Sequence, residues 1–207
     1  MHCGDNKSGD KPCADEAYPR ILGWFEQFQH PLVYVPGDNE WTDCHTAAAG
    51  GFDPLERLQK VRSVFFNDKH LSLGQKPLQL TCQSSVQPEF AGYIEHNRWT
   101  RGGILFATLP VGGRNHNARS SNPAAMTEFQ ARDKAVLAWM QSAFAEAAKP
   151  ECKALALIIH ANPLAEDKRS EPRSEGFVNF VPALREAVMA LPKPVYLFHA
   201  DSHYFRI

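Results

Sequence analysis

Four separate segments of the chain carry aspartate, asparagine or histidine just after a glycine or a short hydrophobic stretch. They are Gly4-Asp5, Gly37-Asp38-Asn39-Glu40, His160 with Asn162, and His199-Ala200-Asp201-Ser202-His203. A mixed set of carboxylate, amide and imidazole groups suits Mn, Fe or Zn better than calcium. Two such ions about 3.5–4 Å apart can bind the attacking and leaving oxygens of a phosphoryl transfer and lower the pKa of a bound water. These residue types therefore favour the binding of one or two such metal ions.

Three of these segments follow apolar runs that have the composition of buried strands. Runs of this kind cover Leu32 to Val35, Ile104 to Leu109, Leu155 to Ile159 and Val195 to Phe198. Helical patterns alternate with the runs, which is typical of an α/β domain whose sheet is covered on both faces. In open α/β sheets ligands bind at the carboxyl edge of the strands, so we expect the polar groups to converge on one site.

Four segments show the pattern of helices. They are Asp15 to Gln29, a segment that begins with Asp53 and Pro54, a long segment headed by Thr127 and Gln130, and about Val178 to Met189. Asp53 is expected to cap its helix with Pro54 at the first position, and Thr127 with Gln130 has the pattern of a capping box. The polar stretches 71–98 and 112–123 are predicted to be long loops, which are often functional in a compact domain.

Length and composition narrow the possible functions. With 207 residues and a net charge of −1, the chain predicts one domain and lacks the basic excess of nucleic-acid-binding proteins. No apolar run is long enough to cross a bilayer, and no signal peptide is visible. The five cysteines form no C-x-x-C pair, which argues against a structural zinc site or a thioredoxin-like redox motif. They permit two disulfides and one thiol.

The order of the motifs resembles that of the calcineurin-like metallophosphoesterase superfamily. Its usual motifs run Asp-x-His, Gly-Asp, Gly-Asn-His-Glu/Asp, a lone His and Gly-His-x-His. The similar segments here are Gly4-Asp5, Gly37 to Glu40, His160, and Ala200 to His203. Pro36 to Cys44 and the closing His-Tyr-Phe-Arg are similar to a bacterial subgroup with a Gly-Asp-Asn-Glu motif. The resemblance implies one metallophosphoesterase domain over residues 1–207, with a four-layer α/β/β/α sandwich.

The same resemblance implies a hydrolase with a dinuclear site of two divalent ions, which would be Mn, Fe or Zn. It would hydrolyse a phosphomonoester or phosphodiester, in a small molecule or a polymer, through a metal-bound hydroxide. Carried over by position, Asp5 would bridge the two metals. Asp38, His160 and Asp201 would bind the second metal, and His203 would bind the first.

Asn39 departs from the family pattern, because it occupies the position where a histidine usually assists the leaving group. An amide can orient a phosphoryl oxygen by donating a hydrogen bond, but it cannot act as a general acid at neutral pH. If a proton is needed, His116, His45, Glu40 or water must supply it. The candidate catalytic residues are therefore Asn39 and His116.

The Asp-x-His motif has no counterpart in the chain, so the first metal keeps only Asp5 and His203 as ligands. We expect the chain to be a fragment that lacks the first motif strand and the C-terminal strands. The resemblance and the cysteines favour export of the full-length protein to the periplasm or the outside of the cell. Cys13 and Cys44 each follow a site motif, and a disulfide between them would staple two loops.

Two other interpretations remain open from the sequence. The chain is alternatively a catalytically inactive domain that binds a phosphorylated ligand, or a non-functional fragment of the enzyme. An α/β hydrolase with a serine nucleophile is disfavoured because the chain has no Gly-x-Ser-x-Gly elbow.

Overall fold

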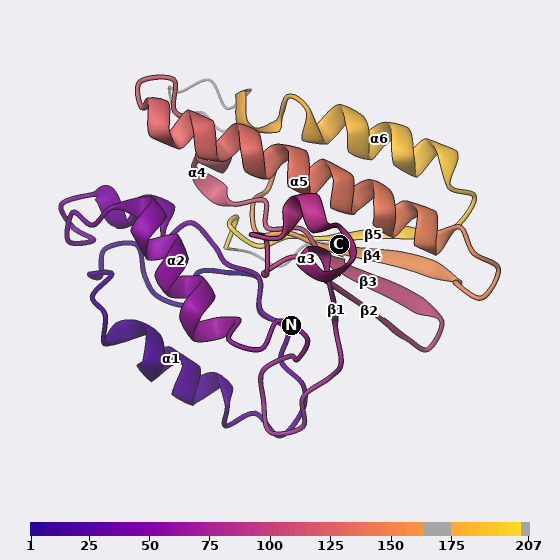
Figure 1. Ribbon diagram of the computed structural model, residues 1–207, viewed down its shortest axis with the longest axis horizontal. Coiled ribbons are helices and arrows are strands. Elements are labelled where there is room, and N and C mark those ends of the chain that lie inside the picture. Colours follow the sequence, from indigo (N-terminus) through magenta and orange to yellow (C-terminus); the bar gives the residue numbers. More distant parts are fainter. Residues whose placement is uncertain (164–174, 204–207) are drawn as a thin grey trace. The chain divides into compact units, whose positions relative to one another are not determined.

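The computed structural model describes residues 1–163 and 175–203 (Figure 1). The chain divides into two compact units, Met1–Asn97 and Arg98–Ile207. Its strands form a five-stranded mixed sheet in the order β1–β2–β3–β4–β5. The predicted α/β class is thereby confirmed, while the single metallophosphoesterase domain stays a prediction.

The second unit is built around the parallel part of the sheet. The strands are β2 (Asn97–Arg101), β3 (Ile104–Thr108), β4 (Ala154–Ile158) and β5 (Val195–Phe198). β2 is antiparallel to β3, whereas β3, β4 and β5 run parallel to one another. Three of the four predicted strands are confirmed within one or two residues, because each is a short apolar run that the sheet buries.

The register of the parallel strands brings their last residues into line. Thr108 of β3 pairs with Ile158 of β4, and Ile158 pairs with Phe198 of β5. The chain therefore leaves all three strands at the same edge of the sheet. This is the edge at which α/β sheets place their ligands.

Two helices pack beside these strands, namely α5 (Pro123–Ala147) and α6 (Phe180–Ala190) (Figure 1). The predicted capping box at Thr127 was wrong. The α5 helix begins one turn earlier, where Asn122 accepts a hydrogen bond from the backbone N–H of Ala125 at 3.1 Å. The Thr127 hydroxyl instead donates to the carbonyl of Pro123 at 2.9 Å. Proline at the first helical position after an asparagine cap is a strong start signal.

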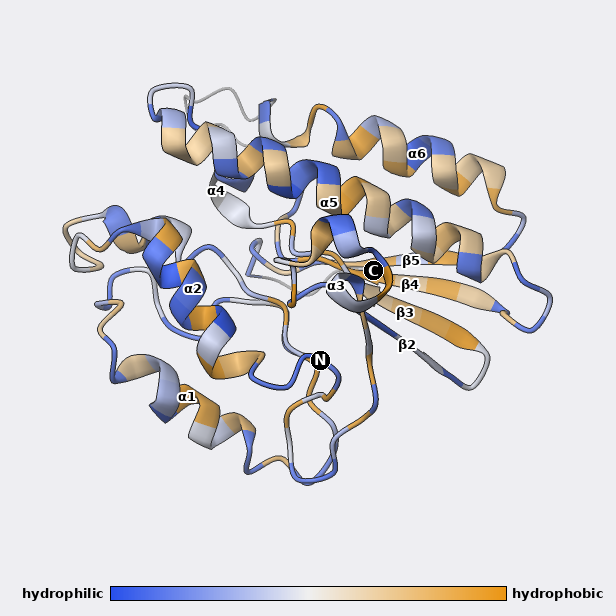
Figure 2. Ribbon diagram, viewed as in Figure 1, coloured by the Kyte–Doolittle hydropathy of each residue, from blue (hydrophilic) through white to orange (hydrophobic). Residues whose placement is uncertain are grey.

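The core of the second unit lies between the helices and one face of the sheet. It is formed by apolar side chains that include Leu105, Trp139, Met140, Leu155 and Leu157. Figure 2 shows the apolar character of strands β3 to β5. Because side chains alternate along a strand, the opposite face carries another set. That set includes Phe106, Tyr196 and Phe198, and the last two are 52% and 43% exposed.

The first unit has two main helices, α1 (Ala17–Phe25) and α2 (Pro54–Phe65). The predicted cap of α2 is confirmed, since Asp53 accepts hydrogen bonds from the N–H groups of Leu55 and Glu56, both at 2.9 Å. An aromatic cluster forms much of the core. It comprises Tyr18, Phe25, Tyr34, Phe65 and Phe66.

The predicted strand Leu32 to Val35 pairs less regularly than expected. Tyr34 forms an isolated parallel bridge with His2, and Leu32 forms an antiparallel bridge with Leu73. Short elements complete the fold. The stretches predicted as loops are interrupted by β1 (Thr81–Cys82), α3 (Gln83–Val86), η2 (Pro88–Phe90) and α4 (Gly113–His116). The other short elements are η1 (Thr42–His45) and η3 (Glu175–Phe177).

Candidate metal centre

Two aspartates of the first unit follow backbone segments that run side by side. The His2 N–H donates to the carbonyl of Val33, and the Val35 N–H donates to the carbonyl of His2, both at 2.9 Å. The two segments are parallel at this bridge. Asp5 and Asp38 lie three and four residues beyond the bridged pair, so they emerge at the same end.

The two carboxylates approach each other closely. One oxygen of Asp5 and one of Asp38 lie within 4.8 Å, and the Asn39 N–H lies 3.4 Å from Asp5 Oδ1. Gly37 permits this approach, because a Cβ at that position would lie 2.5 Å from both the backbone nitrogen and Oδ1 of Asp5. The Gly-Asp pairing of the motif therefore has a steric cause within this unit.

The backbone of several candidate ligands is left-handed. Asp5 has φ 55°, Asp201 has φ 49° and His203 has φ 56°. Aspartate and histidine both enter this region more often than most residues do. Residues held in such conformations cluster at active and ligand-binding sites. The left-handed backbone is therefore compatible with a ligand-binding role at these positions.

A disulfide joins the loops that follow the two aspartates. It links Cys13 to Cys44, which confirms the predicted staple. Arg57 donates from Nη1 to the Cys13 carbonyl at 2.7 Å. The Tyr18 hydroxyl donates to the Glu40 carbonyl at 2.9 Å. The disulfide therefore belongs to a buried set of contacts that supports both loops.

Polar groups around the aspartates are partly desolvated. Burial lowers the pKa of Lys7, and the nearby Glu40 carboxylate opposes that shift. Burial also raises the pKa of Tyr34 well above its ordinary value, and Glu40 acts in the same direction. Glu40 is fully buried and accepts a hydrogen bond from the Asn6 N–H. These effects place the Asp5 loop in a low-dielectric environment, where charge interactions are strong.

Asn39 is half-buried, and its Nδ2 donates to the Lys7 carbonyl at 3.3 Å. It therefore contacts the Asp5 loop, and its role in orienting substrate stays a prediction. Two of the residues considered as proton donors differ in their access to solvent. His45 is exposed, with Nδ1 2.6 Å from the Thr42 carbonyl, whereas Glu40 is fully buried.

The second unit places His160 directly after β4, at the carboxyl edge. Its N–H donates to the Val111 carbonyl at 3.2 Å, and its own carbonyl accepts from the Ala200 N–H at 2.9 Å. These bonds tie together the loops that follow β3, β4 and β5. The side chain is fully buried, and Nε2 lies 4.0 Å from Asp201 Oδ1.

The separation of His160 and Asp201 can be compared with what a shared ion requires. Ligand atoms bind zinc at about 2.0–2.2 Å, so two of them on one ion lie at most about 4.4 Å apart. The 4.0 Å separation meets this limit. His203 follows two residues later and is exposed, and Tyr204 to Arg206 of the closing motif lie outside the described residues.

His116 follows β3 and is almost completely buried, with an exposed fraction of 1%. Its Nδ1 accepts from the Gly112 N–H at 3.1 Å, and Arg132 Nη1 lies 2.8 Å from the same atom. The ring also stacks on Phe177 and meets Phe129 edge-on. The ring is thus buried with Nδ1 accepting a hydrogen bond, and the role of His116 as a proton donor stays a prediction.

Sequence reasoning missed Arg132, whose side chain is 1% exposed. A signal was present, since an arginine interrupts the apolar series Phe129, Val136 and Met140 on the buried side of a predicted helix. Glu128 stands four residues earlier, the spacing of a helical ion pair. The sequence alone does not distinguish such a pair from an exposed one.

The donor set agrees with a transition-metal ion or zinc. The first unit brings Asp5 and Asp38 together, and the second unit brings His160 and Asp201 together. Carboxylate and imidazole are ligands that Mn, Fe and Zn share.

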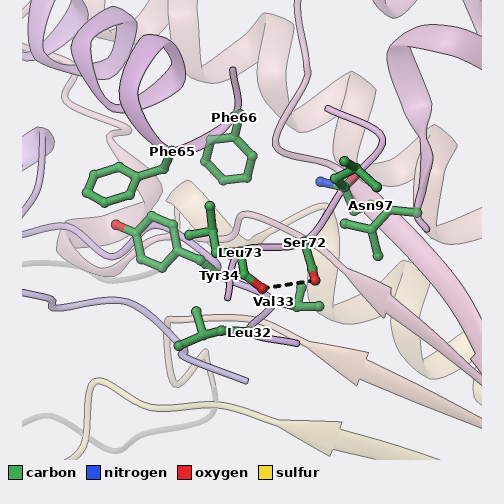
Figure 3. A pocket seen from close by; sticks show the side chains of 10 residues that line it. Leu32, Val33, Tyr34, Phe65, Phe66, Ser72, Leu73 and Asn97 are labelled. Atoms are coloured by element: carbon green, nitrogen blue, oxygen red, sulfur yellow. Dashed lines mark hydrogen bonds between the residues drawn. The ribbon is translucent and has the colours of Figure 1, made fainter. Parts of the chain in front are cut away.

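A small pocket of the first unit lies apart from these ligands (Figure 3). Its lining is mainly apolar and includes Leu32, Tyr34, Phe65 and Phe66. The Ser72 hydroxyl in its wall donates to the Leu73 carbonyl at 3.1 Å, as Figure 3 shows. None of the candidate metal ligands contributes to the lining, so this pocket is not the candidate centre.

No protein-family model, curated protein or solved structure matches this chain. Among the helices of residues 1–163 and 175–203, none combines the length and the apolar character needed to span a membrane. The function of the chain is therefore inferred from the residues of the candidate centre and the distances between them.

Proposed function

We propose that this chain carries the metal-binding residues of a phosphoesterase of the calcineurin-like type. The observation that carries the proposal is the approach of Asp5 and Asp38 to within 4.8 Å beside Gly37, where an added Cβ would lie 2.5 Å from Asp5. The His160 and Asp201 pair, at 4.0 Å, supplies a second set of donors. The reaction is hydrolysis of a phosphomonoester or phosphodiester.

The proposed ligands retain the assignment made from the motifs. Asp5 would be shared by two ions, Asp38, His160 and Asp201 would hold one of them, and His203 would hold the other. When bound, divalent ions would supply positive charge to phosphoryl oxygens and lower the pKa of a water molecule.

Asn39 binds and orients the phosphoryl group. Its amide has two N–H donors, and the one that the structure describes as bonded reaches the Lys7 carbonyl at 3.3 Å. The backbone N–H of the same residue lies 3.4 Å from Asp5 Oδ1. Substrate orientation and the position of Asp5 are therefore coupled through one residue.

The proposal extends to a four-layer sandwich. The sheet face opposite α5 and α6 carries Phe106, Tyr196 and Phe198, which are large aromatic residues with incomplete burial. A second sheet packed on that face would bury them, as facing sheets do in sandwich folds.

The proposal is tested by metal binding first and by turnover second. We expect the purified chain to bind Mn²⁺ and to hydrolyse p-nitrophenyl phosphate or its bis ester. Asp5→Asn and Asp38→Asn should each weaken Mn²⁺ binding by more than about tenfold, the low end for residues that support a metal site. Asp10→Asn removes an exposed carboxylate from the same loop and should leave binding unchanged.

Three outcomes separate the alternatives. Metal binding that depends on Asp5 and Asp38, with turnover, supports the enzyme. The same binding with ester affinity and no turnover supports the inactive ligand-binding domain. A chain that binds no Mn²⁺, Fe²⁺ or Zn²⁺ contradicts both readings of the centre.

A further inference from the structure

The side chain of Arg132 is buried in α5 and connects that helix to a loop at the carboxyl edge of the sheet. Nε donates to Glu128 Oε1 at 2.6 Å, which is an ion pair within the helix. Nη1 donates to the Pro110 carbonyl at 3.2 Å, and Nη2 donates to the His116 carbonyl at 2.9 Å. We call residues 110–116 the β3 strap, because they follow β3 and are held at both ends by one guanidinium.

The β3 strap in turn holds the backbone of His160. The Val111 carbonyl accepts from the N–H groups of His160 and Ala161, at 3.2 and 2.9 Å. Gly112 donates to His116 Nδ1 at 3.1 Å, which closes the strap on itself. Arg132 binds the Pro110 carbonyl, and the next residue, Val111, accepts the hydrogen bond from the His160 N–H. A short path of bonds therefore links Arg132 to a proposed metal ligand.

The end of the strap has an unfavourable backbone. Asn115, His116 and Asn117 are all left-handed, with φ of 55°, 55° and 65°. Three such residues in succession persist only where the surroundings hold them. Glu128 Oε2 accepts from Asn117 Nδ2 at 2.7 Å, and Arg132 contacts the His116 carbonyl. The Glu128 and Arg132 pair thus supplies that restraint from both sides.

We propose that Arg132 is a positioning residue of the metal centre, which sets the place of His160 through the β3 strap. This inference depends on the proposed function, because it takes His160 as a metal ligand. Buried ion pairs are weak sources of stability, and apolar replacements are often neutral or stabilising. A pair that binds the carbonyls of Pro110 and His116 and the side chain of Asn117 is better explained by the geometry that it enforces.

The test compares two arginines of the full chain that each pair with a glutamate. Arg132→Lys removes the planar fork from the strap, whereas Arg62→Lys does the same to the Arg62 and Glu95 pair of the first unit. Both variants should lose stability in urea. Only Arg132→Lys should weaken Co²⁺ binding by about 10–100-fold, the range seen when outer residues of a metal site are changed. It should also shift the visible absorption of bound Co²⁺.

Glu128→Gln is a milder second variant, which keeps the shape of the pair and removes its charge. If Arg132→Lys does not fold, Glu128→Gln should still weaken Co²⁺ binding relative to Arg62→Lys. Equal Co²⁺ affinity and an unchanged spectrum in the Arg132 or Glu128 variant overturn the inference. If His160→Ala leaves the affinity unchanged while Asp5→Asn lowers it, the assignment of His160 fails. A wild-type chain that binds no Co²⁺ overturns the proposed function and the inference together.

Discussion

The Nε2 atom of His160 lies 4.0 Å from the Oδ1 atom of Asp201, and the two belong to loops that follow neighbouring parallel strands. This distance exceeds the 2.7–3.2 Å range of a direct hydrogen bond, so the pair is not arranged for each other alone. The carbonyl of His160 meanwhile accepts from the Ala200 N–H at 2.9 Å. The backbone thus brings the two side chains together and leaves room between their ligand atoms.

The first prediction concerns this pair. Asp201→Asn keeps the shape of the side chain and removes its charge, and we expect the affinity for Mn²⁺ to fall by more than about tenfold. Isothermal titration of the chain with Mn²⁺ measures the change. Glu186→Gln makes the same chemical change at an exposed position of α6 and should have no effect. Equal losses in both variants would show that the effect is one of overall charge.

A second prediction follows from the lack of a side chain at Gly37. Gly37→Ala would place a Cβ 2.5 Å from the backbone nitrogen and Oδ1 of Asp5. Since backbone cannot yield as a flexible side chain does, we expect a loss of about 1–3 kcal/mol in the free energy of unfolding. Metal affinity should fall as well, because Asp5 must move. Urea denaturation and metal titration measure the two effects.

Gly23→Ala is the matched control for that variant. Gly23 lies within α1, and nothing lies within 4 Å of a Cβ added there. Alanine in a helix interior is favoured over glycine by about 0.5–1 kcal/mol, so this variant should be more stable than the wild type. A Gly37→Ala protein as stable as the wild type would contradict the steric argument.

The third prediction concerns the disulfide between Cys13 and Cys44. The denatured, unreduced chain should present three reactive thiols, from Cys3, Cys82 and Cys152, and five after reduction. Replacing both disulfide cysteines with serine should lower the free energy of unfolding by about 2–4 kcal/mol. Metal affinity should also fall, because the bond joins the loops of Asp5 and Asp38. If the metal affinity is unchanged after reduction, the disulfide contributes to the stability of the fold and not to metal binding.

The fourth prediction uses the buried pair of Arg62 and Glu95, whose closest atoms are 2.6 Å apart. Burial raises the pKa of the Glu95 carboxyl and Arg62 lowers it, and the net effect is a pKa below the ordinary 4.5. A carboxyl with a lowered folded-state pKa contributes stability above its unfolded pKa and loses it as the pH falls through the folded value. The contribution is therefore present above about pH 4.5 and declines below it.

Glu95→Gln should accordingly destabilise the protein at neutral pH by about 3–5 kcal/mol, because it leaves a buried guanidinium without its counter-charge. The difference from the wild type should shrink as the pH falls below 4.5. Urea denaturation at about pH 7 and about pH 3.5 measures both quantities. A difference that does not change with pH would mean that packing, and not charge, accounts for the loss.

The parallel strands were predictable because each is a nearly pure apolar run. β4, with the sequence ALALI, is buried at every residue. The antiparallel strand β2, with the sequence NRWTR, was missed because it is mostly polar, and its only large apolar residue, Trp99, stacks on Phe106 of β3. This strand is defined by its pairing with β3, and the sequence of a single segment does not show which segment it pairs with.

The candidate ligands were predictable in identity, because aspartate and histidine after strands are conspicuous. The residues that hold these ligands in place were harder to predict. The role of Arg132 depends on where the β3 strap folds back, which a helical pattern does not specify. For His116, proton transfer stays a prediction, and its burial against Phe129 and Phe177 was not predictable from a polar loop.

The left-handed backbone at Asp5 and Asp201 has an evolutionary consequence. Replacement by glutamate would keep the carboxylate, yet glutamate and β-branched residues enter this region at a higher cost than asparagine, aspartate or glycine do. Substitutions at these two positions should therefore preserve the left-handed backbone more strictly than the negative charge. Homologues that lose the metal should first acquire asparagine or glycine there. An alignment would then show Asp, Asn and Gly at these positions, but not Glu.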